Sequence, residues 1–322
     1  MGKRKRVGLI LGAGGITGGA WLAGMLSGIT AATGWEPGTA DLVVGTSAGS
    51  VMAALIASGL SARRLTPPEN DPAGDWPLRD LIRRESYAAG GALPFLAPRS
   101  LGLLLAAVTY PGSSWTRGTR LLSALAPRGR VPTEAIRRAV RKNVPEGWVQ
   151  HPACWIVATE YASGRRVVFG RDRGADLASA VAASCAVPGV FGPVAIGGRE
   201  YVDGGVASPT NADLAGLAAV DVVICVNPLA RRPPRRSLHP AAPFEALIRD
   251  SACRQVDREI AGLEAMGIEV LRIEPGPDEL AVMGLDPMNP KFCLEIATRG
   301  AYHARRRVRD LAMADVLRYQ AA

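Results

Sequence analysis

The chain has few histidines, few aromatic residues and no paired cysteines. Three of its 322 residues are His, and Phe, Trp and Tyr together make up 5%. The five Cys residues are scattered, odd in number and form no Cys-x-x-Cys pair, so we expect neither a disulfide framework nor a metal site. Few aromatic side chains are available to stack on bases and no nucleic-acid motif is present, so we expect no nucleic-acid partner.

Long apolar runs are also absent. No stretch reaches the uninterrupted length of a transmembrane helix. The basic residues 3–6 followed by the apolar residues 7–11 resemble a signal peptide, but the apolar run is short and gives way to glycines. We interpret residues 7–11 as a first buried strand, and we expect a cytoplasmic protein with free, buried thiols.

The remaining composition is that of a globular protein. Hydrophobic residues make up 48% of the chain, which is enough to bury a large core, and no fixed-period repeat is present. We therefore expect a single domain over 1–322. Within it, residues 61–130 predict a helical insertion, which either packs on the core or forms a cap whose exposed apolar residues contact lipid chains. Residues 290–322 predict a basic C-terminal helix.

The net charge of +9 favours anionic partners. Basic runs occur at 3–6, 231–236 and 305–309. The simplest interpretation is a solvated basic face, and the next is peripheral contact with an anionic membrane. The composition predicts nothing about the oligomeric state.

A nucleophile elbow is the clearest motif in the sequence. An apolar run at 42–44 ends in Gly45-Thr46-Ser47-Ala48-Gly49 and passes into an Ala-rich, helix-compatible segment. Strand, sharp turn and helix form the context in which Gly-x-Ser-x-Gly presents a reactive serine. Ser47 would lie at a helix N-terminus, where free N–H groups favour developing negative charge.

A glycine-rich loop at 12–19 follows the first predicted strand. Its glycines are near the dinucleotide-binding pattern, but their spacing differs and no acidic residue ends a second strand about 20 residues further on. Glycines also let successive N–H groups converge on an anion, which an acyl-transfer serine requires for its oxyanion. Since parallel strands end at one edge of a sheet, we interpret this loop as an oxyanion loop.

The sequence offers two kinds of base for Ser47. A serine usually works with a histidine held by a carboxylate, but His151, His239 and His303 lie in no context typical of an active site. Asp203 follows a short apolar strand and precedes two glycines, so its carboxylate could reach the serine directly. Asp-Gly-Gly is also a common turn sequence.

Taken in order, these blocks resemble the patatin-like phospholipase family, in its bacterial branch. The resemblance covers the glycine block at 11–24, the elbow, residues 183–191, Val202-Asp203-Gly204-Gly205 and Asn211, and more loosely 283–288. It implies a three-layer α/β/α fold with a mainly parallel central sheet. It also implies a Ser–Asp dyad that hydrolyses acyl esters of lipids without a histidine, a metal or an organic cofactor.

Carried over to this chain, the resemblance implies Ser47 as the nucleophile, Asp203 as the base and the N–H groups of Gly14, Gly15 and Ile16 as the oxyanion hole. The supporting motif residues are Ala13, Gly18, Gly45, Thr46, Ala48, Gly49, Gly204 and Gly205. One departure from the family is Thr17, where many members carry Arg or Lys.

We therefore expect a serine acyl hydrolase of the lipid esterase, phospholipase A or lysophospholipase type, acting on a lipid or acyl-ester substrate through an acyl-enzyme. An acyltransferase that uses the same dyad is the nearest alternative. A nucleotide-binding protein and a non-catalytic, membrane-associated protein are the alternatives from other classes.

Overall fold

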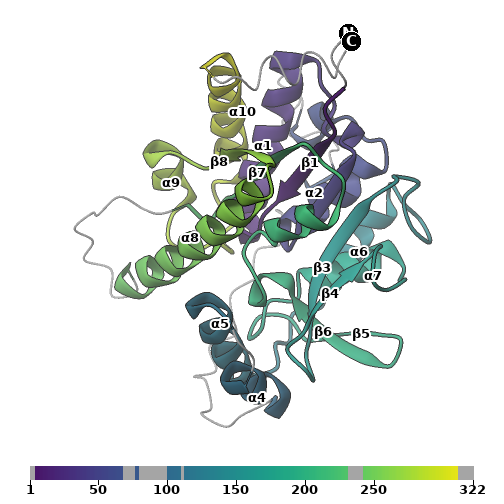
Figure 1. Cartoon of the computed structure of the whole chain (residues 1–322), viewed down its shortest axis with the longest axis vertical. Coiled ribbons are helices and arrows are strands. Elements are labelled where there is room, and N and C mark those ends of the chain that lie inside the picture. The colour runs from purple at the N-terminus through teal and green to yellow at the C-terminus, as the bar shows by residue number, and fades with distance from the viewer. Residues whose placement is uncertain (1–3, 68–76, 80–99, 110–111, 231–241, 311–322) are drawn as a thin grey trace.

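The computed structural model describes residues 4–67, 77–79, 100–109, 112–230 and 242–310. Their centre is an eight-stranded sheet with the order β5-β6-β3-β2-β1-β7-β8, and β4 pairs with β3 outside this path (Figure 1). The strands are β1 Val7–Leu11, β2 Leu42–Thr46, β3 Cys154–Glu160, β4 Arg166–Phe169, β5 Val194–Ile196, β6 Arg199–Asp203, β7 Val222–Val226 and β8 Glu269–Ile273.

The central strands are parallel. β1 pairs in parallel with β2 and β7, β2 with β3, and β7 with β8, whereas β3–β4, β3–β6 and β5–β6 are antiparallel. All five residues of β1, β2 and β7 are buried, as expected of strands covered on both faces. The sequence predictions of a mixed α/β class and a mainly parallel central sheet are confirmed.

Alternate residues of these strands supply two separate cores. Val7, Leu9 and Leu11 belong to a core with helices α1 (Gly15–Thr33), α2 (Ala48–Ala57), α6 (Glu134–Arg141), α7 (Leu177–Ser184) and α10 (Cys293–Asp310). Ile10 belongs to a core on the other face, with α8 (Ala242–Ala265) and the 3-10 segment η4 (Ala212–Leu217). The sheet therefore lies between two helical layers, and Figure 1 has α8 in the foreground.

The parallel strand ends position the chemistry. β1 ends at Leu11 beside Gly45 of β2, so the glycine loop and the elbow leave the sheet at the same edge. β6 pairs antiparallel with β3 at Ala158 and Asp203, and this register brings Asp203 to that edge as well. Three segments far apart in the sequence thus meet at one place.

The predicted insertion at 61–130 contains three described elements. These are η2 (Ala62–Leu65), α4 (Leu101–Thr109) and α5 (Ser114–Leu125). Residues 78–87 have the sequence pattern of an amphipathic, basic helix, but most of them lie outside the described residues. Figure 1 shows α4 and α5 together at the lower end of the molecule.

The remaining described segments complete the chain. They are η1 (Pro37–Thr39), η3 (Gly204–Val206) and α9 (Pro277–Met283). The predicted C-terminal helix is α10 as far as residue 310, and residues 311–322 lie outside the described part. No helix in the described part of the chain combines the length and the apolarity that crossing a bilayer requires.

Candidate active site

Ser47 occupies a strained turn between β2 and α2. Its backbone has φ 53° and ψ −123°, a left-handed conformation that residues other than glycine rarely adopt. Close packing at the two motif glycines enforces this turn, because a Cβ on Gly45 would lie 2.5 Å from the Cα of Ser50, and one on Gly49 would lie 2.0 Å from the Leu11 carbonyl oxygen. This geometry is that of a nucleophile elbow.

The side chain of Ser47 is paired with that of Asp203. Ser47 Oγ donates a hydrogen bond of 2.6 Å to Asp203 Oδ2, and each residue has only 5% of its surface exposed. The other carboxylate oxygen of Asp203 accepts a hydrogen bond of 2.7 Å from the Gly205 N–H. The proton on Ser47 therefore has a carboxylate acceptor already in place.

Burial raises the pKa of Asp203 to about 6, and the hydrogen bonds from Ser47 and Gly205 partly oppose that shift. A carboxyl with such a pKa is ionised at neutral pH, yet it is a stronger base than an ordinary aspartate. Both properties suit a group that accepts a serine proton.

Neither of the described histidines contacts this pair. His151 Nε2 lies 2.8 Å from the Ala40 carbonyl oxygen, and its Nδ1 accepts a hydrogen bond from the Ala153 N–H at the start of β3. His303 lies on α10, with its ring against that of Tyr302. His239 falls outside the described residues.

The glycine loop presents backbone N–H groups at the start of α1. The N–H of Ala13 donates to Pro209 O at 2.8 Å, and that of Thr17 donates to Pro287 O at 3.1 Å. Within the described part of the chain, no acceptor is recorded for the three N–H groups between them, those of Gly14, Gly15 and Ile16. A helix N-terminus with unsatisfied N–H groups is suited to an anion.

The other predicted motif residues lie around this pair. Gly18 is in the first turns of α1, where its N–H donates to Gly14 O at 2.9 Å. A Cβ on Gly204 would lie 2.3 Å from Val157 O, and one on Gly205 would lie 3.6 Å from the Ala13 side chain. The Asp203 loop therefore packs closely on both β3 and the glycine loop.

Hydrogen bonds from α7 and from residues 208–211 hold the elbow in place. Ser184 Oγ accepts from the Ser47 N–H at 2.9 Å and donates to Val157 O at 2.6 Å. Asn211 Nδ2 donates to Thr46 Oγ1 at 3.0 Å. The sequence analysis assigned no role to Ser184, although it lies in the 183–191 block, because a lone serine gives no local signal of a contact 137 residues away.

Cys185 also contacts the backbone of the nucleophile. Its Sγ donates to Ser47 O at 3.2 Å, and burial raises the pKa of the thiol. The thiol is therefore protonated at neutral pH and acts as a hydrogen-bond donor to the elbow.

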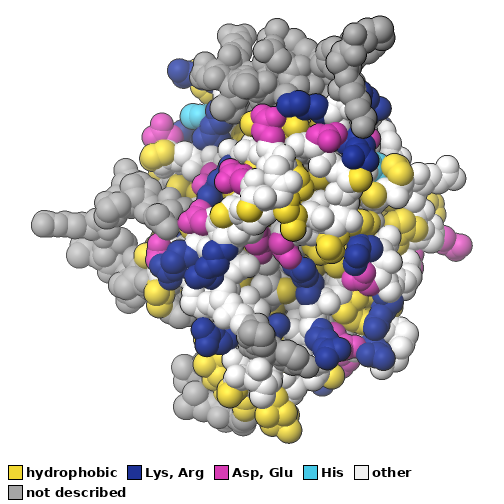
Figure 2. Space-filling view, in the orientation of Figure 1, with side chains coloured by type: hydrophobic (Ala, Val, Ile, Leu, Met, Phe, Trp, Pro, Cys, Tyr) yellow, Lys and Arg dark blue, Asp and Glu magenta, His cyan; other side chains and the backbone are white. Residues whose placement is uncertain are grey.

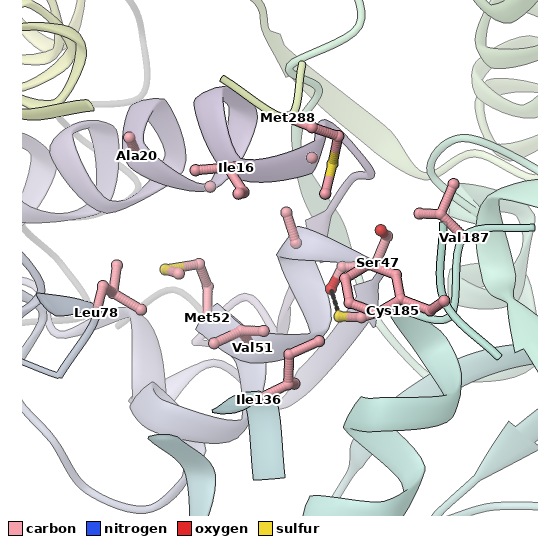
Figure 3. Close-up of a pocket in the computed structure, with 14 residues that line it drawn as sticks. Ile16, Ala20, Ser47, Val51, Met52, Leu78, Ile136, Cys185, Val187 and Met288 are labelled. Carbon is pink, nitrogen blue, oxygen red and sulfur yellow. Dashed lines mark hydrogen bonds between the residues drawn. The ribbon is translucent and has the colours of Figure 1, made fainter. Parts of the chain in front are cut away.

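An apolar cavity opens beside Ser47. Figure 3 shows Ser47 and Cys185 at one end, with Met52 and Leu78 at the other. The lining residues come from six separate parts of the chain and are Gly15, Ile16, Gly19, Ala20, Ser47, Ala48, Val51, Met52, Leu78, Ile136, Cys185, Val187, Phe191 and Met288. Beyond the motifs, none of the cavity residues could be predicted from the sequence, because long-range packing brings them together.

Among the described residues, no group of three or more His, Cys, Asp or Glu is arranged to hold a metal ion. The polar groups at the cavity end are the hydroxyl of Ser47, the carboxylate of Asp203 and backbone N–H groups. These are groups for nucleophilic and acid–base chemistry.

The α/β sheet carries a buried serine next to an aspartate at a sharp strand-to-helix turn, an arrangement suited to acyl transfer. The model of one family, the patatin-like phospholipases, matches residues 9–215. The chain therefore belongs to the patatin-like phospholipase family, which implies lipid acyl hydrolase activity.

Among solved structures, the chain is similar to the crystal structure of VipD from Legionella pneumophila. The two are 12% identical with a TM-score of 0.37, and the match covers 95% of this chain and 67% of the VipD chain. At that TM-score, the similarity says nothing about activity or substrate.

Proposed function

We propose that this protein is a serine hydrolase of lipid acyl esters that uses Ser47 and Asp203 as a dyad. The observation that carries the proposal is the 2.6 Å hydrogen bond from Ser47 Oγ to Asp203 at one end of an apolar cavity. The N–H groups of Gly14, Gly15 and Ile16, which have no acceptor among the described residues, support it, because they give the oxyanion of an acyl-transfer reaction a place to bind.

In the first half of the reaction, Ser47 Oγ attacks the ester carbonyl carbon while Asp203 Oδ2 accepts the hydroxyl proton. The carbonyl oxygen becomes an oxyanion, which the N–H groups of Gly14, Gly15 and Ile16 stabilise. The ester C–O bond then breaks, and the proton on Asp203 passes to the departing alcohol. The product of this half is an acyl group bound to Ser47.

In the second half, a water molecule replaces the alcohol. Asp203 accepts a proton from the water as its oxygen attacks the acyl-enzyme, and the proton returns to Ser47 Oγ as the fatty acid leaves. In each half of the reaction, the Asp203 carboxylate both accepts a proton and gives it back. A pKa of about 6, near neutrality, suits this double role better than the lower pKa of an exposed aspartate.

The cavity suggests which part of the substrate is bound. Its lining is apolar apart from the Ser47 hydroxyl and the Cys185 thiol, so it suits the hydrocarbon of an acyl chain. None of the described lining residues offers a charged side chain to a polar head group. We therefore propose that the acyl chain enters the cavity and the leaving alcohol, with any head group, lies outside it. This placement is compatible with an esterase, a phospholipase A or a lysophospholipase.

Hydrolysis of a soluble short-chain ester tests the proposal. We expect Ser47→Ala and Asp203→Ala each to lower kcat/KM by at least about a hundredfold, because each removes a reacting group. Ser58→Ala is a matched control at the end of α2, where the hydroxyl bonds only its own helix at Leu55 O. Activity that persists in either dyad variant, with the control behaving as wild type, would overturn the dyad.

A further inference from the structure

Helix α4 is apolar on all sides, yet one side faces solvent. The sequence of the helix, Leu101–Thr109, contains no charged residue. Leu103 and Ala106 are buried, whereas Leu101, Leu105 and Val108 have 66%, 53% and 79% of their surface exposed. Spacings of four and three residues place these three side chains on one face. A helix that is apolar all round is normally covered on every side.

Helix α5 extends this apolar surface. It packs against α4, and its Leu121 and Leu122 are 43% and 49% exposed. Figure 2 shows hydrophobic side chains gathered at the lower end of the molecule, where α4 lies in Figure 1. We refer to Leu101, Leu105, Val108, Leu121 and Leu122 as the cap face. Exposed apolar patches on a folded protein mark interaction surfaces.

The segment that carries the cap face is basic. Residues 86–133 contain no Asp or Glu, whereas five Arg residues occur at 99, 117, 120, 128 and 130. Arg120 is buried and Arg128 is paired with Glu200, so neither is available at the surface. Arg117 is exposed on α5, and it forms no ion pair with any described residue. An apolar face accompanied by exposed positive charge complements a surface that is apolar inside and anionic outside, which describes a bilayer with anionic lipids.

The same helix pair also contacts the loop after Asp203. Three side chains of α5 donate to successive carbonyl oxygens of that loop: Trp115 Nε1 to Gly205 at 2.9 Å, Thr119 Oγ1 to Val206 at 2.7 Å and Thr116 Oγ1 to Ala207 at 3.1 Å. A partner that binds the cap face would therefore lie close to the loop that follows Asp203 in the candidate active site.

From these observations we propose that the cap face docks this protein onto a lipid bilayer that contains anionic lipids. The apolar side chains of α4 and α5 enter the boundary between head groups and acyl chains, while the exposed Arg117 binds lipid phosphates. The purpose of docking rests on the proposed function, since a lipid hydrolase must reach esters that lie in a bilayer. The docking itself requires no turnover.

Vesicle co-sedimentation tests the proposal without any substrate being consumed. The probes are phosphatidylcholine vesicles with and without phosphatidylglycerol, at low and high salt. We expect wild type to bind the mixed vesicles, and to bind less at high salt because the arginine contribution is screened. The double variant Leu105→Asp/Val108→Asp should lose at least about tenfold in partition coefficient, because two carboxylates replace the inserting side chains.

Leu217→Asp is the matched control. Leu217 is 58% exposed on η4, which packs in the core of the opposite face with α8. Its substitution adds one carboxylate at an exposed apolar position, as Val108→Asp alone does, without touching the cap face. Circular dichroism melting of both variants checks that each is folded. If the double variant unfolds, Val108→Asp alone, at the most exposed of these positions, replaces it.

Retained binding by Leu217→Asp together with lost binding by the cap-face variant would support the proposal. Three results would overturn it: no binding by wild type, equal binding by the cap-face variant, or a wild-type dimer that the cap-face variant converts to a monomer. The last result would show that a second copy of the chain covers the face. Failure of ester hydrolysis would overturn only the proposed function, because binding is measured separately.

Discussion

The indole Nε1 of Trp115 donates a hydrogen bond of 2.9 Å to the carbonyl oxygen of Gly205, whose own N–H donates 2.7 Å to Asp203. Trp115 is therefore connected to the Asp203 carboxylate through the backbone of Gly205. It touches neither Ser47 nor Asp203 in any recorded hydrogen bond, so its expected role is to position the base.

Trp115→Phe removes this donor and keeps the apolar ring. We expect kcat on a soluble ester to fall about fivefold with KM little changed, since one hydrogen bond of about 1 kcal/mol then no longer fixes the loop. Trp35→Phe is the matched control, because Trp35 is buried and its Nε1 has no partner among the described residues. An equal loss in both variants would mean that Trp115 has only a structural role.

The pH dependence of hydrolysis should follow Asp203. Burial raises its pKa to about 6, and only the ionised form accepts the serine proton. We therefore expect kcat/KM to rise with pH through about 6 and to level off above it. A rate profile measured in buffers of constant ionic strength checks this expectation, and a profile that is flat between pH 5 and 8 would contradict the role of Asp203 as base.

The raised pKa of Asp203 also predicts that its ionised carboxylate destabilises the folded protein at neutral pH. A carboxyl whose pKa rises on folding from the ordinary 3.8 to about 6 binds its proton more tightly in the folded state. Its contribution to stability is therefore present below pH 3.8 and lost as pH rises through about 6. A pKa shift of this size corresponds to about 3 kcal/mol of folding free energy. This is the upper limit of the destabilisation caused by ionised Asp203 at neutral pH.

Asp203→Asn removes the charge and should be inactive yet more stable than wild type at pH 8. The gain should shrink toward zero at pH 4, where wild-type Asp203 is protonated too. Urea unfolding at both pH values measures the difference. Asp172→Asn, at a surface carboxylate paired with Arg171, should show no such pH-dependent gain. An Asp203→Asn variant less stable than wild type at pH 8 would contradict the account.

The sequence alone predicted the arrangement of the fold well. The apolar runs at 7–11 and 42–44 became central strands because their residues are buried on both faces. The family resemblance placed Ser47 and Asp203 together, and they lie within hydrogen-bond distance although 156 residues separate them. Their catalytic roles remain predictions.

Other features could not be read from the sequence. Ser184, Trp115 and Cys185 reach the site through contacts between distant segments, which leave no local pattern. Residues 100–109 are strongly apolar and predict a short helix, but only the folded structure distinguishes the buried face of α4 from its exposed one. The cavity likewise depends on how α1, α2 and α6 pack.

The length of the acyl chain should depend on the far end of the cavity. Met52 lines it there, on α2, and Met52→Phe adds volume while keeping the surface apolar. We expect kcat/KM for long-chain esters to fall about tenfold relative to short-chain esters, because the longer chain loses buried methylene groups. Met266→Phe, at an exposed position, is the control. An unchanged ratio of long-chain to short-chain activity would place the acyl chain elsewhere.

The most direct measurement is the intact mass of the protein after treatment with a fluorophosphonate, which reacts covalently with activated serines. The proposed dyad predicts a single adduct on wild type, none on Ser47→Ala, and slow labelling of Asp203→Asn, since the base that activates Ser47 is then missing. Unlabelled but folded wild-type protein, or an adduct that persists in Ser47→Ala, would contradict the assignment of Ser47 as the nucleophile.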